Sequence, residues 1–307
     1  MKAPKYTGVA TFFGLPSVTD LSQTDIAVVG VPFDLGVTNR AGARHGPREM
    51  RNQSTMIRQH HQLLRMTPTD LCRIADAGDC PVQNPYSLED GHRDIETFYT
   101  QLAQADTVPL TAGGDHSITL PIFRAIARER PVGMLHFDAH CDTSDEFGNT
   151  RFHHGAPFRI AVEEGLLDPE RTVQIGIRGS LGDEDTWKFS HDSGMRVVYM
   201  DELLDRGYQA IVAEARELLS GGPVYLSFDV DGLDPAFAPG TGTPEIGGIS
   251  TVEAQAMLRA ARGLDFIGGD LVEVAPPFDV TGTTSLVGAS ILFDILCLLA
   301  DAHASRA

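Results

Sequence analysis

Apolar segments rich in β-branched residues alternate along the whole chain with segments of helical periodicity. We expect strands at residues 26–33, 108–112, 132–137, 173–177, 197–200, 224–228 and 266–274. We expect helices at residues 47–61, 93–105, 118–128, 157–164, 210–219, 252–262 and 286–304. Strands that are apolar throughout are typical of parallel sheets covered by helices on both faces. The sequence therefore predicts an α/β fold, a three-layer α-β-α sandwich with a mostly parallel central sheet, formed by one domain over residues 1–307.

The sequence Asp138-Ala139-His140-Cys141-Asp142 directly follows the apolar segment 132–137. Strand side chains alternate between faces, so Asp138, His140 and Asp142 share one face and Cys141 takes the other. Two carboxylates and an imidazole packed at a strand end are costly unless a cation lies between them. By itself this pattern fits a metal site and a polar turn equally well.

Two further strand ends carry residues of the same kind. Asp229 and Asp231 end the apolar segment 224–228, and His116 follows the segment 107–112. In parallel sheets, ligands bind at the carboxyl ends of strands, which meet at one edge. Four Asp and two His are too many for a four-coordinate zinc ion, which prefers Cys and His, so a zinc deacetylase is disfavoured. Oxygen-rich sets suit Mn2+, either as one six-coordinate ion or, preferably, as a carboxylate-bridged pair about 3.5–4 Å apart.

The composition limits the kinds of molecule that the protein is expected to bind. The formal net charge of −18 argues against binding to nucleic acid or an anionic membrane and is compatible with a small cationic substrate. We find no apolar run of bilayer-spanning length and no signal-peptide core at the N-terminus. Four cysteines without a C-x-x-C pair predict a reduced, cytoplasmic protein.

Several motifs, taken in order, resemble those of the ureohydrolase (arginase/agmatinase) family, and the resemblance spans most of the chain. The matching motifs lie at residues 113–117, 138–142, 154–155, 227–235, 240–244 and 273–274. Arginases carry an Asn soon after the D-x-H-x-D motif to hold the α-carboxylate of arginine, whereas this chain has Thr143-Ser144-Asp145-Glu146. Together with the double histidine His153-His154, this makes the chain most similar to agmatinases and related guanidino-compound amidinohydrolases, and implies an arginase-like fold.

The resemblance implies a binuclear site. One ion would be held by His116, Asp138, Asp142 and Asp229. The other would be held by Asp138, His140, Asp229 and Asp231, so that Asp138 and Asp229 bridge the two. Such a pair lowers the pKa of a bound water from about 15.7 towards about 7, which allows attack on the guanidinium carbon to give urea and an amine.

The resemblance also implies roles for residues that are not metal ligands. Glu273 would clamp the substrate guanidinium through paired hydrogen bonds, although a buried structural ion pair would explain it too. His154 would bind substrate and shuttle protons, and Asp142 could also stabilise the leaving amine. We interpret His136 as a core histidine directed away from the metals. His153 and Cys141 receive no role.

Two substrate classes remain open. The acidic residues near position 145 favour agmatine, hydrolysed to putrescine and urea as in polyamine biosynthesis. The alternative is a guanidino acid, 4-guanidinobutanoate or 3-guanidinopropanoate, whose carboxylate Arg151 could pair. A non-catalytic metal-binding subunit is a distant third, disfavoured because every ligand position is intact. The resemblance also implies a homotrimer or homohexamer.

Overall fold

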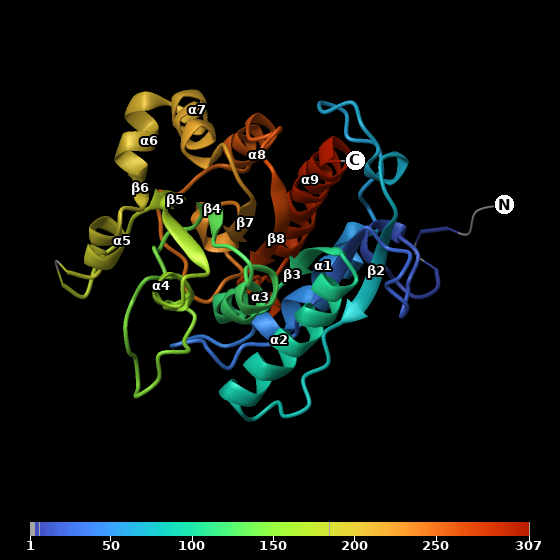
Figure 1. Ribbon diagram of the computed structural model, residues 1–307, viewed down its shortest axis with the longest axis horizontal. Helices are drawn as coiled ribbons and strands as arrows, with labels where there is room; N and C mark the ends of the chain where they lie inside the picture. Colours follow the sequence, from blue (N-terminus) through green and yellow to red (C-terminus); the bar gives the residue numbers. More distant parts are fainter. Residues whose placement is uncertain (1–3, 6, 184, 307) are drawn as a thin grey trace.

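The computed structural model describes residues 4, 5, 7–183 and 185–306, which form an eight-stranded sheet of order β2-β1-β3-β8-β7-β4-β5-β6 (Figure 1). Every pair of neighbouring strands is parallel. The strands are β1 (Ile26–Gly30), β2 (Ile74–Asp79), β3 (Val108–Ala112), β4 (Val132–Phe137), β5 (Leu167–Ile177), β6 (Arg196–Tyr199), β7 (Val224–Asp229) and β8 (Phe266–Val272). The α-helices are α1 (Gly46–Ser54), α2 (Leu88–Gln104), α3 (Thr119–Ile126), α4 (Pro157–Glu163), α5 (Lys188–Ser193), α6 (Met200–Arg206), α7 (Tyr208–Leu219), α8 (Thr251–Ala260) and α9 (Thr283–Arg306).

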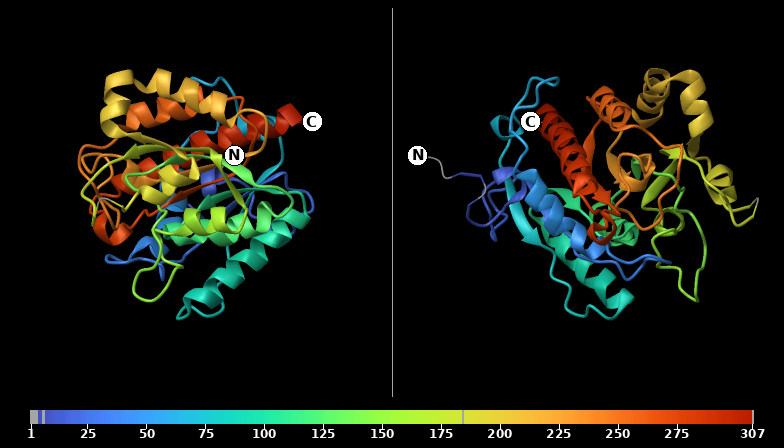
Figure 2. Two further views of the ribbon diagram at one scale, coloured as in Figure 1. Left: turned by 60° about the vertical axis from the view of Figure 1, so that its left-hand side comes forward. Right: turned by 180° about the vertical axis from the view of Figure 1, so that it is seen from behind.

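Helices cover both faces of the sheet, which confirms the three-layer α-β-α prediction (Figure 2). One core packs α1 and α6 to α9 against one face, and the other packs α2, α3 and α4 against the opposite face. The strands supply alternate residues to the two cores. In β1, for example, Val28 belongs to the first core and Val29 to the second. Both faces are buried, which is why the strand sequences are apolar throughout.

Local signals set several helix ends. Ser250 and Glu253 form a reciprocal capping box at the start of α8, and Ser87 accepts a hydrogen bond from the backbone N–H of Asp90 at the start of α2. Each interaction satisfies backbone donors that the first helical turn leaves unpaired. The helix starts are therefore specified by residues next to them in the chain.

Helix α9 is apolar on all sides, with a mean hydropathy of 1.9 over 18 residues. It is thus long and apolar enough to cross a membrane, and the expectation that no segment has this length was wrong. In the structure 78% of that window is buried. Packing of α9 against β3, β8, α1 and α8 accounts for its composition without a bilayer.

Several elements differ from the expected ones. Strand β2 was missed because Asp76, Gly78 and Asp79 interrupt its apolar pattern at the sheet edge. The short helices α5 and α6 were also missed. Helix α1 ends at Ser54, seven residues before the predicted end, and Met56 beyond it is 59% exposed, so this part of the segment has little apolar surface to bury.

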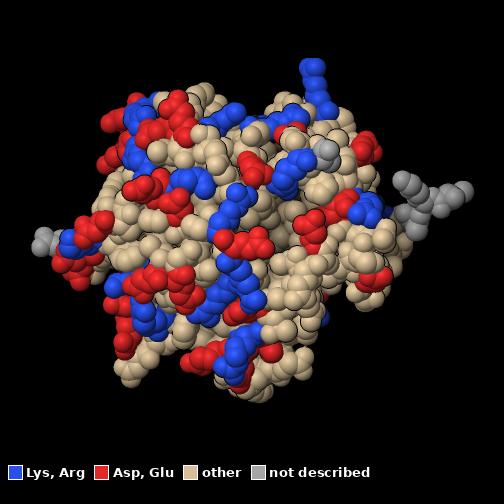
Figure 3. Space-filling model, in the orientation of Figure 1, with Lys and Arg blue, Asp and Glu red and all other residues tan. Residues whose placement is uncertain are grey.

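Acidic and basic side chains are interspersed on the face of the molecule seen in Figure 3. Charges of opposite sign pair elsewhere in the molecule as well, as in the exposed pair of Lys188 with Asp192 and the half-buried pair of Arg196 with Glu214. On this face no continuous basic band of the kind that binds nucleic acid is visible.

Candidate metal centre and active site

The chemically active side chains lie at the carboxyl ends of β3, β8, β7 and β4, the four adjacent strands at the centre of the sheet. His116 begins a short 3-10 turn after β3, and residues 138–142 follow β4. Asp229 ends β7 and Asp231 lies in the turn after it, while Glu273 directly follows β8. All six residues predicted as metal ligands therefore meet at one edge of the sheet.

His116 lies at the centre of the first group of possible ligands. Its Nδ1 is 2.9 Å from Oδ2 of Asp142, 3.2 Å from Oδ2 of Asp229 and 3.3 Å from Oδ2 of Asp138. These four residues are buried and their ligand atoms lie within 4.8 Å of one another. The predicted first ligand set is thus assembled.

The contacts of the other ring nitrogen of His116 determine which nitrogen carries the proton. Its Nε2 lies 2.8 Å from the hydroxyl of Ser227, which donates to Asp270 at 2.7 Å. The hydroxyl therefore accepts the Nε2 proton, and in the neutral ring Nδ1 carries a lone pair. This Nδ1 is buried without a hydrogen-bond partner and faces three carboxylates. A cation between these atoms would satisfy all of them, so the donor set fits a divalent metal.

The second group contains Asp138, His140 and Asp231. Nδ1 of His140 lies 3.3 Å from Oδ1 of Asp138 and 3.3 Å from Oδ2 of Asp231. Asp138 belongs to both groups, with one carboxylate oxygen on each side, as a bridging ligand requires. Asp229 belongs only to the first group, the one around His116. Its predicted role as a second bridging ligand therefore stays a prediction.

Burial makes these carboxylates difficult to ionise together. It raises the pKa of Asp229 well above the usual value, and repulsion from Asp231 and Asp138 adds to the shift. Burial likewise raises the pKa of Asp231 to about 6, although His140 opposes the shift. Divalent ions would supply the positive charge that keeps the group deprotonated at neutral pH.

His136 was predicted to point away from the metals, and this was wrong. Its Nε2 lies 2.9 Å from Oδ2 of Asp138, because residues 136 and 138 share a face of the strand. The amide of Gln174 donates to Nδ1 of His136 at 3.1 Å and to the carbonyl of Cys141 at 2.7 Å. His136 therefore donates through Nε2 and orients the carboxylate shared by the two groups.

His154 lies beside the ligand groups and links two segments. Its Nδ1 is 2.9 Å from Oε1 of Glu273, which also accepts the backbone N–H of His116 at 2.9 Å. Its Nε2 is 3.2 Å from the backbone N–H of Thr38 and 2.9 Å from the Thr38 hydroxyl. A donor and an amphoteric hydroxyl next to Nε2 accommodate both protonation states of the ring. Such surroundings suit a proton shuttle.

Two of these residues have left-handed backbones, with φ of 51° at Asp142 and 64° at Glu273. This conformation is uncommon for residues with a side chain and is held by the surrounding structure. At Glu273 the backbone N–H donates to the carbonyl of Gly114 at 2.8 Å. Both carboxylates are thus directed by backbone strain that the fold maintains.

A cavity of about 300 Å3 opens over the ligand groups. It is lined by Thr38, His140, Asp142, Ser144, Glu146, Phe147, His153, His154, Gly155, Trp187, Asp229, Asp231 and Thr243. Glu273 lies behind His154, outside this lining. Arg151 is also outside it, 41% exposed and paired with Asp145 and Glu163 at 3.0 and 2.6 Å.

Sequence reasoning did not find several lining residues. Thr38 belongs to the long loop after the first strand, and such loops are often functional. Trp187, the only tryptophan of the chain, had no motif to mark it, and its ring centroid lies 6.5 Å from that of His140. Cys141, in the segment after β4, is buried with Trp187, Ile177 and Val197 and belongs to neither ligand group.

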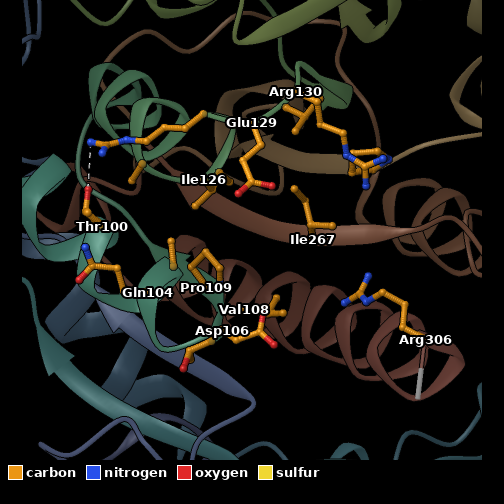
Figure 4. A pocket seen from close by; sticks show the side chains of 16 residues that line it. Thr100, Gln104, Asp106, Val108, Pro109, Ile126, Glu129, Arg130, Ile267 and Arg306 are labelled. Carbon is orange, nitrogen blue, oxygen red and sulfur yellow. Dashed lines mark hydrogen bonds between the residues drawn. The ribbon is translucent and has the colours of Figure 1, made fainter.

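A larger cavity of about 570 Å3 lies near the start of β3 and β8, away from the metal ligands (Figure 4). Of its arginines, Arg128 donates to Thr100, another lining residue, and to Glu96, and Arg306 pairs with Asp265. None of the grouped ligand residues lines it. The grouped ligand residues are therefore associated with the cavity over the carboxyl ends of the strands.

Comparison with known proteins places this arrangement in a family. Residues 24–298 match the model described as "Arginase family". The chain belongs to the arginase family. It is 56% identical to a guanidinopropionase of Pseudomonas aeruginosa over 305 residues, covering 99% of this chain and 96% of that protein. It is 48% identical to the mitochondrial agmatinase of Gallus gallus over 293 residues, covering 95% of this chain and 86% of that protein.

Among solved structures, proclavaminate amidino hydrolase from Streptomyces clavuligerus matches with a TM-score of 0.94 at 38% identity, covering 98% of this chain and all of that one. These matches confirm the arginase-like fold and the ureohydrolase resemblance. Arginase-family members are hydrolases of guanidino C–N bonds and depend on binuclear metal sites, and this chain is such a hydrolase. The described residues include a cluster of His and Asp that could bind the metals.

Proposed function

We propose that this protein is a guanidino-acid hydrolase that converts 3-guanidinopropanoate to urea and 3-aminopropanoate. The observation that supports this substrate is the 56% identity to a guanidinopropionase over almost the whole chain, against 48% to an agmatinase. Agmatine, the first expectation from the sequence, therefore becomes the second candidate. The longer 4-guanidinobutanoate is also a guanidino acid, and it is included in the substrate comparison described below.

Two divalent ions, of which Mn2+ best suits oxygen-rich ligands with some imidazole, would be held by the six residues of the two groups. When bound, such a pair supplies a water activated for attack at neutral pH. His136 holds the carboxylate of Asp138 in place, and the Ser227–Asp270 pair holds the ring of His116. The metal sites are thus supported by hydrogen bonds on their protein side.

His154 and Glu273 would handle the guanidinium group and the proton. Oε1 of Glu273 is occupied by His154 and by the backbone of His116, whereas its Oε2 is buried and has no hydrogen-bond partner. An N–H of a substrate guanidinium would satisfy this atom. His154 lines the cavity and would donate its proton to the leaving amine, receiving it back through the Thr38 hydroxyl.

The substrate carboxylate would be bound by neutral donors. Among the described residues that line the cavity, none is Lys or Arg. The hydroxyl of Ser144 and the indole N–H of Trp187 belong to lining residues and are donors suited to a carboxylate. Arg151, predicted from the sequence for this task, is held by two carboxylates outside the lining.

Agmatine is favoured by a different observation. Glu146 lines the cavity, and a carboxylate there suits the ammonium tail of agmatine better than an anionic tail. A guanidino acid must therefore bind with its carboxylate directed away from Glu146. This geometric requirement makes the two candidates separable by substrate kinetics.

The decisive experiment measures urea release by the Mn2+-loaded protein from 3-guanidinopropanoate, 4-guanidinobutanoate, agmatine and arginine. We expect the highest kcat/KM with 3-guanidinopropanoate. A higher value with agmatine would replace the proposal by its second candidate, and no urea from any substrate would refute both. The Asp231→Asn variant, which lacks one ligand charge, serves as the inactive control.

We further propose that the protein is cytoplasmic, as its cysteine usage predicts, and that it assembles as a homotrimer or homohexamer, as the family resemblance implies. Light scattering coupled to size-exclusion chromatography measures the assembly directly. A monomer at micromolar concentration would contradict this proposal without affecting the substrate assignment.

A further inference from the structure

The guanidinium of Arg178 is surrounded by backbone carbonyls. Arg178 directly follows β5, and its backbone N–H donates to the carbonyl of Ala139, between the metal ligands of the β4 strand end. Its side chain donates to six carbonyl oxygens at 2.7–3.2 Å, those of Gly176, Asp231, Gly232, Leu233, Glu245 and Ile246. An arginine has five N–H donors, so all of them are used and at least one is shared.

These carbonyls come from two segments that are separate in the sequence. Residues 231–233 carry the metal ligand Asp231, and residues 245–246 lie at the far end of the loop that follows. The two segments are also joined by backbone bonds between Asp234 and Ile249 at 3.0 Å and between Ile249 and Gly232 at 3.1 Å. Arg178 therefore closes the base of this loop.

A side chain of the closed loop contacts one of the proposed metal ligands. The hydroxyl of Thr243, within the loop, donates to Oδ2 of Asp231 at 3.1 Å. This is the same oxygen that faces His140. The other oxygen of Asp231 accepts the backbone N–H of Ala139 at 3.2 Å. The position of the Asp231 carboxylate thus depends on the two segments that Arg178 joins.

The fit around the guanidinium is tight. A Cβ on Gly248 would lie 2.5 Å from Nη2 of Arg178, closer than any real contact. No carboxylate oxygen of a described residue lies within 4.0 Å of the Arg178 nitrogens, so carbonyl dipoles take the place of a salt-bridge partner. The three donors of a lysine lie on one ammonium nitrogen. They cannot reach six acceptors that are arranged around a planar guanidinium.

We propose that Arg178 is a positioning residue that fixes Asp231, through the closed loop, as a ligand of the second metal ion, the one shared by Asp138 and His140. Arg178 contacts neither the ion nor the substrate. Its loss would leave the first ligand group around His116 intact and would loosen the second. The inference rests on the binuclear site proposed above and is independent of which guanidino compound is the substrate.

The test is Mn2+ binding to the full-length Arg178→Lys variant, measured without substrate by competition with a chromogenic chelator. Groups behind a metal ligand typically change metal affinity by about 10–100-fold when mutated. We expect one of two ions to bind about 10–100-fold more weakly and the other with the wild-type affinity. Activity should return at high Mn2+ concentration, because the catalytic groups are unchanged.

Arg171 provides a matched control in the same strand. It lies in β5 at the opposite end, and it too donates to backbone carbonyls, those of Leu219 at 3.0 Å and Pro223 at 3.3 Å. Arg171→Lys removes two bonds of the same kind, next to the start of β7 and away from the metal ligands. We expect it to lower the thermal midpoint and to leave both Mn2+ affinities unchanged.

The possible results distinguish a failure of this inference from a failure of the proposed metal site. Two ions bound with wild-type affinity by folded Arg178→Lys would overturn the inference and leave the proposed function standing. No Mn2+ binding by the wild-type protein would instead refute the metal site itself. If Arg178→Lys does not fold, Arg178→Gln decides, because its amide removes the charged fork but keeps two N–H donors for the carbonyls. Weakened binding of one ion supports the inference, and unchanged binding refutes it.

Discussion

Nδ1 of His154 lies 2.9 Å from Oε1 of Glu273, although the two residues are 119 positions apart in the sequence. Both side chains are largely buried, and the ring also contacts Thr38 through Nε2. A histidine held between a carboxylate and a hydroxyl at the wall of the cavity is placed to carry protons to and from a leaving group. The first two predictions test this pair.

The His154→Asn variant should lose proton transfer while it retains the shape of the cavity. General acid–base catalysis contributes about 10²–10⁴-fold, so we expect kcat to fall by about that factor. KM should change little, because the metal ligands and Glu273 remain. Steady-state urea release measures both constants, and a kcat within threefold of wild type would exclude the shuttle role.

The same pair should make stability depend on pH. Burial lowers the pKa of His154, but Glu273 outweighs it and raises the pKa to about 9. A raised pKa means that the folded state binds the proton more tightly than the unfolded state. The stabilisation is therefore complete below about pH 6.5 and is lost as the pH rises through about 9. Urea unfolding of metal-free wild type and His154→Asn at pH 6 and pH 10 should show a larger difference at the lower pH.

Metal removal should destabilise the protein. The ligand carboxylates are buried and repel one another, and an ion that binds only the folded state stabilises it by about 2.7 kcal/mol at 100 times its Kd. We expect the thermal midpoint to fall on chelation and to recover with added Mn2+. A midpoint that does not respond to either treatment would show that the cluster holds no metal.

Asp138 and Asp231 should differ in their effect on metal content. Asp138 has one oxygen in each ligand group, whereas Asp231 belongs to the second group alone. Asp138→Asn should therefore lose both Mn2+ ions, and Asp231→Asn should lose one. Elemental analysis of the dialysed proteins gives the stoichiometry. Equal losses in the two variants would contradict the shared position of Asp138.

Arg151→Ala tests the role predicted from the sequence. Because Arg151 pairs with Asp145 and Glu163 at the surface, its removal should cost at most about 1 kcal/mol of stability. We expect the KM for 3-guanidinopropanoate to change by less than about threefold, as for a residue outside the cavity. A large rise in that KM, with agmatine turnover unaffected, would restore Arg151 as the carboxylate partner.

Much of the fold and the ligand set could be predicted because the signals are local. Apolar runs such as 132–137 predict buried strands, and the spacing of Asp138, His140 and Asp142 predicts three ligands at the strand end, although β4 itself ends at Phe137. The same spacing places His136 with them, a consequence that the prediction overlooked. Strand β2 could not be predicted, since its Asp and Gly residues are stabilised by contacts with distant segments such as Phe12 and Arg51.

The sequence by itself determined the α/β architecture and the residue types that gather at the strand ends. Periodicity and ligand chemistry are properties of short segments, so they can be read from the chain directly. The tertiary structure decided that β8 and β7 lie between β3 and β4, and hence that Glu273 meets His154. It also decided that Thr38 contacts His154 and that Arg178 donates to carbonyls of residues more than 50 positions away. These contacts depend on how the chain crosses between strands, which no local pattern specifies.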